Sequence, residues 1–335
     1  MAKMALVSVA VRTHNRSEYL RQAVQSILDQ TFQDYEIVIC DDASTDDTPT
    51  VCRDLEQLDR RIRTLRQSNN VGILGSWQAG LAASRGRYFV ILDDDNCFLP
   101  TFLEKAVAAL QATPIAVYVF TDEWFVNAER NRNVQVTEAA SKQYGRTGLM
   151  PGLHEDSSFI ALRQSPGINS SLFDRQKLVD AGGFRTLGGE LADFDVFLNL
   201  AYLKKSCYYI PERLLEYRIH AGANTATLAD RTDQAKTSIA ILQSLSFEGQ
   251  AEHYRRRRLA GNHVWLSRAL ALHGDFGAAR KEVKKARLLT PKDLRTLLIS
   301  TLLALPMSVL CQVLRMRYGK RFQKPPASNA PLKDA

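Results

Sequence analysis

A run of acidic and amide residues directly follows an apolar segment in the N-terminal half: Asp93, Asp94, Asp95 and Asn96 come after residues 88–92. Three adjacent carboxylates repel one another, so a cation normally accompanies such a cluster unless water surrounds it. A strand that ends in hard oxygen ligands indicates Mg²⁺ or Mn²⁺ bridging to a phosphorylated ligand. The alternative is an acidic loop tip that is simply solvated.

Length and charge suggest a large domain with a basic appendage. The chain of 335 residues can bury a substantial core. Residues 1–252 carry a net charge of −6 and residues 253–335 a net charge of +14. The five cysteines are scattered, without any pair or Cys/His cluster of zinc spacing, which indicates a reducing compartment and no structural metal. The apolar run 6–11 is too short for a signal peptide, so we expect a cytoplasmic protein.

Short apolar runs alternate with helical patterns over the first 125 residues, which is typical of βαβ units and a largely parallel sheet. The predicted strands are residues 6–11, 36–40, 62–65, 88–92 and 116–121. Ligands of such sheets bind beyond the carboxyl ends of the strands. The residues after the first strand, the pair Asp41 and Asp42 after the second, and the acidic run after the fourth are therefore expected on one rim.

The remainder of the chain divides into two parts. Residues 126–168 show a weak pattern, which we interpret as an insertion that forms part of a substrate cleft. We expect one domain over residues 1–228 and a helical, basic extension over 229–335. The apolar stretch 294–314 is too interrupted to span a bilayer. With its basic flank it indicates attachment to an anionic membrane surface, and packing on the first domain is the alternative. Nucleic acid is not expected as a partner.

Four motifs occur in the order and spacing of a known family. They are Val7 to Arg16, Gln30-Thr31-Phe32, Glu36 to Asp46, and Gly86-Arg87-Tyr88 leading to Asn96. The chain resembles the family 2 glycosyltransferases, which pass a sugar from a nucleotide diphosphate to an acceptor hydroxyl. The resemblance is specific over residues 5–122, looser to about 225 and absent beyond. It implies the GT-A fold, an α/β architecture with a Rossmann-like, mostly parallel sheet flanked by helices. It also implies that residues 1–228 form the glycosyltransferase domain, with a nucleotide-binding half (1–122) and an acceptor and catalytic half (123–228).

The resemblance implies a nucleotide pocket at the first two loops. Arg12 and His14 would line the base pocket, where many members have proline and tyrosine, and an imidazole can still stack on a base. Asp42 matches the carboxylate that reads the uracil edge. Asp41 beside it would brace the loop.

The acidic run and one histidine match the remaining donor contacts of the family. Asp93 and Asp94 are candidates for the ribose hydroxyls, and Asp95 matches the metal-binding carboxylate. His220 follows a stretch that in some members brings a histidine to the metal, and Mn²⁺ accepts imidazole. A surface or core histidine is the alternative for His220. The implied cofactor is Mn²⁺ or Mg²⁺.

The expected catalytic base is Asp193, at the start of a predicted helix. Family members typically carry Glu-Asp there, and Ala192 replaces the glutamate in this chain. A structural helix cap is the alternative for Asp193, and Asp195 is expected to be structural.

The resemblance therefore implies a metal-dependent, inverting hexosyltransferase. Its donor would be a UDP-sugar, and its acceptor a saccharide or lipid-linked molecule in envelope polysaccharide or glycolipid synthesis, reached from the inner face of the membrane. A dehydrogenase or P-loop NTPase would show glycine-rich phosphate loops that the sequence lacks. The other open reading is a non-catalytic sugar-nucleotide-binding or scaffold protein with the same fold.

Overall fold

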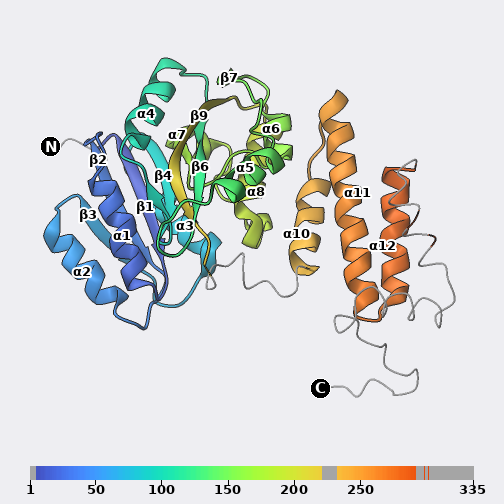
Figure 1. Ribbon diagram of the computed structural model, residues 1–335, viewed down its shortest axis with the longest axis horizontal. Coiled ribbons are helices and arrows are strands. Elements are labelled where there is room, and N and C mark those ends of the chain that lie inside the picture. Colours follow the sequence, from blue (N-terminus) through green and yellow to red (C-terminus); the bar gives the residue numbers. More distant parts are fainter. Residues whose placement is uncertain (1–4, 221–231, 292–297, 299–300, 302–335) are drawn as a thin grey trace. The chain divides into compact units, whose positions relative to one another are not determined.

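Strands and helices alternate through the first part of the chain, as the apolar periodicity predicts. The computed structural model describes residues 5–220, 232–291, 298 and 301, and the chain divides into two units, residues 1–228 and 229–335 (Figure 1). The strands of the first unit are β1 (Val7–Thr13), β2 (Tyr35–Asp41), β3 (Ile62–Arg66), β4 (Tyr88–Asp93), β5 (Cys97–Phe98), β6 (Tyr118–Val126), β7 (Gly152–His154), β8 (Ser171–Asp174) and β9 (Cys207–Arg218).

These strands form one mixed sheet of nine strands in the order β3-β2-β1-β4-β8-β6-β9-β5, with β7 paired to β9. Strands β3, β2, β1 and β4 are parallel. Strand β8 is antiparallel to both β4 and β6, and β6 is parallel to β9. The carboxyl ends of β1, β2, β4, β6 and β9 therefore lie at one edge, where the loops of a doubly wound sheet bind ligands.

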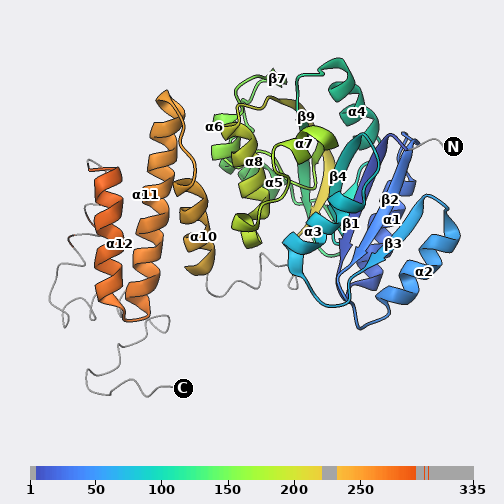
Figure 2. The same ribbon diagram turned by 180° about the vertical axis from the view of Figure 1, so that it is seen from behind.

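Helices cover both faces of the sheet, as Figures 1 and 2 show from opposite sides. The helices of the first unit are α1 (Ser17–Leu28), α2 (Thr48–Leu58), α3 (Gly72–Ala83), α4 (Phe102–Ala112), α5 (Val134–Gln143), α6 (Ser158–Leu162), α7 (Arg175–Asp180), the 3₁₀ helix η1 (Thr186–Leu191) and α8 (Ala192–Tyr202). Segment 126–168, whose sequence pattern is weak, contains α5, β7 and α6.

The main core explains why the strands have continuous apolar sequences. Val7, Val9 and Val11 of β1 face α1, whose buried side chains recur at helical spacing. The opposite face of β1 lies against α3, where a Cβ on Gly80 would be 2.9 Å from the Cβ of Ala10. Since both faces are covered, the strands are apolar on both sides.

The second unit consists of α10 (Thr232–Gln243), α11 (Gly249–Leu272) and α12 (Phe276–Leu289). Helices α11 and α12 pack through Ala260, Val264 and Ala286, and the buried His263 Nδ1 lies 2.6 Å from Glu282 Oε2. Residues 294–314 lie outside the described part, except for residues 298 and 301. Within the described ranges, the helices are too short or too polar to cross a membrane.

Candidate functional site

The loops after β1 and β2 are held together by one asparagine side chain. Asn15 Oδ1 accepts hydrogen bonds from the backbone N–H of Thr45 (2.7 Å) and Asp46 (3.3 Å). Asn15 (φ 53°) and Ala43 (φ 56°) both have left-handed backbone. Asparagine tolerates this conformation but alanine is strained in it, and such strain is concentrated at functional sites.

His14 and Asp42 form the inner wall of these loops. Nδ1 of His14 lies 2.7 Å from the carbonyl oxygen of Asp42. A carbonyl only accepts, so Nδ1 carries the proton and Nε2 accepts from the side-chain amide of Asn70 at 3.2 Å. The buried Asp42 carboxylate accepts from the backbone N–H groups of Val71 (2.7 Å) and Gly72 (3.0 Å). Both residues are therefore oriented by the segment that precedes α3.

Asp41 and Arg12 are at the ends of their strands. The fully buried Asp41 accepts from the backbone N–H of Ser44 at 3.0 Å, inside the turn that follows β2. Arg12 is paired in register with Asp93 of the adjacent strand, and its buried Nε has no hydrogen-bond partner within the described residues. Arg12 is therefore a cation beside the first aspartate of the acidic run.

Asp93 is bonded on both carboxylate oxygens. Trp77 Nε1 donates to Oδ1 at 3.3 Å, and the amide of Asn169 donates to Oδ2 at 3.0 Å. Burial raises the pKa of Asp93, and the positive charge of Arg12 opposes that rise. Asp93 thus joins β4 to α3 and to the segment before β8.

Asp94 is the most deeply buried carboxylate of the run, with 1% of its side chain exposed. The hydroxyl of Thr13 donates to its Oδ2 at 2.7 Å, and Arg16 Nη1 donates to its Oδ1 at 3.2 Å. Burial raises the pKa of Asp94 to about 7, helped by the charge of Asp95 and opposed by Arg16. Asp94 faces the loop after β1.

Asp95 is the meeting point of three segments. Its Oδ2 lies 2.8 Å from Arg16 Nη1 and 3.2 Å from His220 Nε2. Its backbone carbonyl accepts from Arg218 Nε at 3.0 Å. The ring of Tyr19 contacts both the His220 ring (centroids 5.1 Å apart) and the Arg218 guanidinium (4.6 Å). The end of β9 is thereby held against the acidic run, which brings together two residues 125 positions apart.

Asp193 lies in the first turn of α8, where its Oδ1 accepts from the backbone N–H of Phe194 at 2.7 Å. Burial raises the pKa of Tyr144, and the negative charges of Glu123 and Asp193 add to that rise. Asp193 is therefore close enough to Tyr144 to interact with it electrostatically. The preceding segment is attached to α3, because Gln78 Nε2 donates to the carbonyl of Phe184 at 2.8 Å. Helix α3 also carries Trp77, which donates a hydrogen bond to Asp93. The acidic run and the segment before α8 are therefore both hydrogen-bonded to α3.

Asp195 has a different environment two residues later. It is fully buried, and Arg185 binds both of its oxygens, with Nε at 2.9 Å and Nη2 at 2.5 Å. A bidentate arginine neutralises the buried charge and fixes the start of α8. This agrees with the structural role expected for Asp195.

Several residues that build the site had no role in the sequence analysis: Arg16, Tyr19, Trp77, Asn169 and Arg218. For Arg16 a signal existed, since three adjacent carboxylates require a cation and Arg16 lies in the first loop. The others come from segments whose proximity is decided by the tertiary fold.

Asp95 and His220 are the two residues to be tested for their fit to a metal ion. The described residues contain no group of three or more His, Cys, Asp or Glu side chains that could hold a metal ion. The pair formed by Asp95 and His220 supplies one carboxylate and one imidazole, a donor set that suits Mn²⁺. The donor set therefore fits a divalent ion whose remaining ligands are phosphate oxygens or water.

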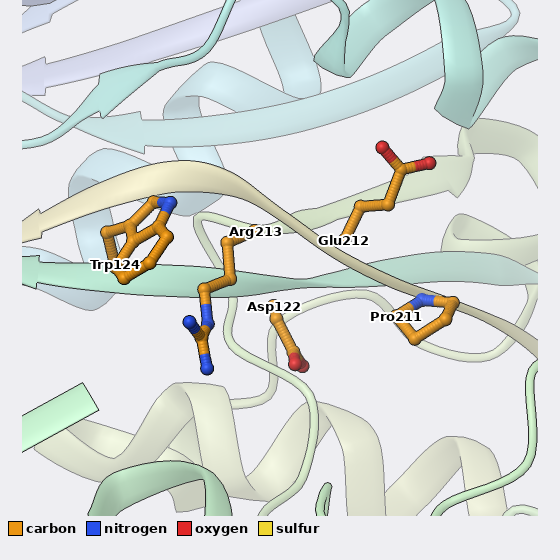
Figure 3. A pocket seen from close by; sticks show the side chains of 5 residues that line it. All are labelled: Asp122, Trp124, Pro211, Glu212 and Arg213. Carbon is orange, nitrogen blue, oxygen red and sulfur yellow. The ribbon is translucent and has the colours of Figure 1, made fainter. Parts of the chain in front are cut away.

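A separate hollow of about 380 Å³ lies where β6 and β9 run side by side. Its lining comprises Asp122, Trp124, Pro211, Glu212 and Arg213 (Figure 3). Asp122 and Arg213 point to the same side of the sheet, and Glu212 points to the other (Figure 3). The Arg213 guanidinium lies 4.3 Å from the centroid of the Trp124 ring. The hollow belongs to the half of the unit that also carries Asp193.

Comparison with other sequences identifies related proteins. Residues 8–166 match the model of glycosyl transferase family 2. An uncharacterized glycosyltransferase of Haemophilus influenzae is 34% identical over 239 residues, which cover 68% of this chain and 69% of that protein. The GalNAc(5)-diNAcBac-PP-undecaprenol β-1,3-glucosyltransferase of Campylobacter jejuni is 39% identical over 221 residues, 64% of this chain and 65% of that protein.

Solved structures of similar fold cover nearly the whole chain. S. aureus TarS 1–349 in complex with UDP-GlcNAc has a TM-score of 0.64 at 16% identity, over 89% of this chain and 90% of that one. The mannosyltransferase PcManGT of Pyrobaculum calidifontis in complex with GDP-Man and Mn²⁺ has a TM-score of 0.57 at 17% identity, over 90% and 80%. At these identities the likeness concerns the fold, which is the GT-A architecture expected from the sequence.

Proposed function

Because the chain belongs to glycosyltransferase family 2, we propose that it transfers a sugar, with inversion, from a UDP-sugar to an acceptor hydroxyl with the help of a divalent cation. The observation that carries the proposal is the 3.2 Å approach of Asp95 Oδ2 and His220 Nε2. It occurs at the edge of the sheet where β1, β2 and β4 end. A carboxylate and an imidazole brought together from distant segments at a ligand-binding edge indicate a shared ligand.

The nucleotide would bind along the first two loops. The imidazole of His14 offers a ring face to the base, and the Asp42 carboxylate keeps lone pairs that can accept a base N–H beside its two backbone bonds. Asp94 or Asp93 would accept the ribose hydroxyls. In this structure both oxygens of each carboxylate accept hydrogen bonds, those of Asp93 from Trp77 and Asn169 and those of Asp94 from Thr13 and Arg16.

Asp95 and His220 would hold Mn²⁺ or Mg²⁺. Such an ion, when bound, supplies positive charge that favours departure of the nucleoside diphosphate. Asp193 would act as the general base that takes the proton from the acceptor hydroxyl, which requires a carboxylate within hydrogen-bond reach of that hydroxyl. Asp193 lies in the first turn of α8, where the helix dipole favours negative charge.

The acceptor would be a saccharide carried on a lipid. The relative from Campylobacter jejuni is named for transfer to an undecaprenol-diphosphate-linked saccharide. The carboxylate, guanidinium and indole around the hollow between β6 and β9 are groups that bond or stack with sugars. The outer side of α12 is basic, with Arg280, Lys281, Lys284, Lys285 and Arg287 exposed. Such a surface would attach a cytoplasmic enzyme to the anionic inner face of the membrane.

A thermal-shift screen of UDP- and GDP-sugars with and without Mn²⁺, followed by a transfer or hydrolysis assay, tests the proposal. A UDP-sugar that raises the melting temperature only with Mn²⁺, and is then turned over, is the expected result. Binding without any turnover across acceptors would favour the non-catalytic alternative. Absence of any nucleotide effect would contradict the proposed donor class.

A further inference from the structure

Arg16 occupies the position of a cation in the acidic run. A single nitrogen, Nη1, lies 2.8 Å from Asp95 Oδ2 and 3.2 Å from Asp94 Oδ1. The side chains of Arg16 and Asp95 are 19% and 14% exposed, so water screens this contact only partly. Arg16 thus supplies compensating charge to Asp94 and Asp95, whereas Arg12 lies beside Asp93.

The oxygen that Arg16 contacts is also the one that faces His220. Asp95 Oδ2 has Arg16 Nη1 on one side and His220 Nε2 at 3.2 Å on another. A metal ion held by this oxygen and by the lone pair of that nitrogen would be a second cation within a few ångströms of the guanidinium. Like charges at such a distance repel strongly, so Arg16 and the metal compete for Asp95.

Asp94 gives Arg16 a second place to bind. Its carboxylate is fixed by the Thr13 hydroxyl at 2.7 Å and is almost fully buried, so it stays in position when Asp95 changes partner. A guanidinium that leaves Asp95 can keep its contact with Asp94 and turn its other N–H groups toward a diphosphate. The diphosphate brings the negative charge that allows both cations to remain.

We propose that Arg16 is a positioning residue that keeps the metal ion from binding tightly until the nucleoside diphosphate arrives, and then helps to hold the diphosphate. This inference depends on the proposed function, because it assumes a metal-assisted nucleotide donor. According to this inference, each of the two ligands, metal ion and nucleotide, raises the affinity for the other, and Arg16 is the origin of this coupling.

Mn²⁺ titrations of the full chain, followed by the electron paramagnetic resonance signal of free Mn²⁺, measure this coupling without any turnover. The titrations are made with and without UDP on the native protein, Arg16→Gln, Arg16→Lys and the control Arg21→Gln. Arg21 lies in the adjacent helix and pairs with Asp54 at the surface. In Arg16→Gln we expect Mn²⁺ alone to bind about tenfold more tightly, and the gain in Mn²⁺ affinity caused by UDP to fall by a similar factor.

Arg16→Lys keeps the positive charge, so its Mn²⁺ affinity should stay closer to that of the native protein. The control Arg21→Gln should have the same Mn²⁺ affinity as the native protein. Equal Mn²⁺ affinity of Arg16→Gln and the native protein, or no Mn²⁺ binding by Arg16→Gln, overturns the inference, provided that its melting temperature shows a folded protein. The thermal shift caused by UDP separates a failure of this inference from a failure of the proposed function. If UDP stabilises both proteins and Mn²⁺ affinity is equal, only the role of Arg16 is wrong; if UDP binds neither protein, the proposed donor is wrong.

Discussion

The first unit contains two groups of aspartates that differ in their hydrogen-bond partners. One group is Asp93 to Asp95 at the end of β4, and the other is Asp193 with Asp195 in α8. The first group is bonded by side chains from β1, α3, the segment before β8 and the end of β9. In the second group, Asp195 is bound by an arginine ten positions away and Asp193 by the adjacent backbone. The first group therefore holds distant segments of the chain together at one edge of the sheet, whereas the Arg185 pair of Asp195 fixes the start of α8.

Asp193→Asn should have the largest effect on activity. We expect kcat to fall on the order of 10³-fold, because an amide cannot take the acceptor proton, while the dissociation constant of the donor stays near its native value. Steady-state kinetics combined with donor titration measure both. Glu190→Gln, an exposed carboxylate in the preceding turn, is the control. Full activity of Asp193→Asn would refute the assignment of the base.

Arg185→Met should cause the largest loss of stability. It leaves the buried carboxylate of Asp195 without its guanidinium, and breaking such a pair from one side costs about 3 kcal/mol. Urea unfolding followed by circular dichroism measures the free energy of unfolding. Arg21→Met removes an exposed pair and should change it by less than about 1 kcal/mol. Similar values for the two variants would remove the distinction between the buried Asp195 and a surface aspartate.

Asp95→Asn should weaken metal-dependent donor binding on the order of a hundredfold, since loss of even an outer-shell partner of a metal ligand costs about 10- to 100-fold. Turnover should fall with it, in contrast to Asp193→Asn. Titration of the nucleotide with Mn²⁺ and with EDTA separates the metal contribution. If native and variant proteins bind nucleotide equally in both conditions, Asp95 does not bind the metal.

Asp94 should make stability depend on pH in the metal-free protein. Its pKa is raised from 3.8 to about 7 by burial, so between about pH 4 and pH 7 the folded protein holds a proton that the unfolded chain has released. The free energy of unfolding should therefore fall as the pH rises, by about 1 kcal/mol per pH unit. Unfolding in EDTA across this range tests the sign, and Asp94→Asn should reduce the slope by the contribution of this one carboxyl group. A slope unchanged in Asp94→Asn would assign it to other groups.

Ala43→Gly should have the smallest effect and a favourable sign. Left-handed backbone costs a non-glycine residue about 1–2 kcal/mol, and the entropy of glycine offsets about half of that. We expect a gain of about 0.5 kcal/mol in the free energy of unfolding. Ala79→Gly inside α3 should instead lose about 1 kcal/mol. A loss at both positions would indicate that the loop after β2 is not strained.

The strands within residues 1–122 could be predicted because their apolar runs are continuous, and the rule for parallel sheets correctly predicted that β1, β2 and β4 end at one edge. The second half could not be predicted to the same extent. Helix α5 has two buried residues, Thr137 and Ser141, both polar, so its sequence lacks an apolar face. Strand β8 was missed because its four residues are too short to show a pattern, although it joins β4 to β6.

By itself, the sequence determined the family, the fold class and the residue types at the sheet edge, because these depend on local periodicity and on motifs of contiguous residues. Only the tertiary structure decided that Arg16 and His220 share one oxygen of Asp95, and that Arg185 binds Asp195 while Asp193 bonds locally. The physical reason is that the surroundings of a charge depend on which distant segments pack against it, and residue spacing along the chain carries no record of that packing.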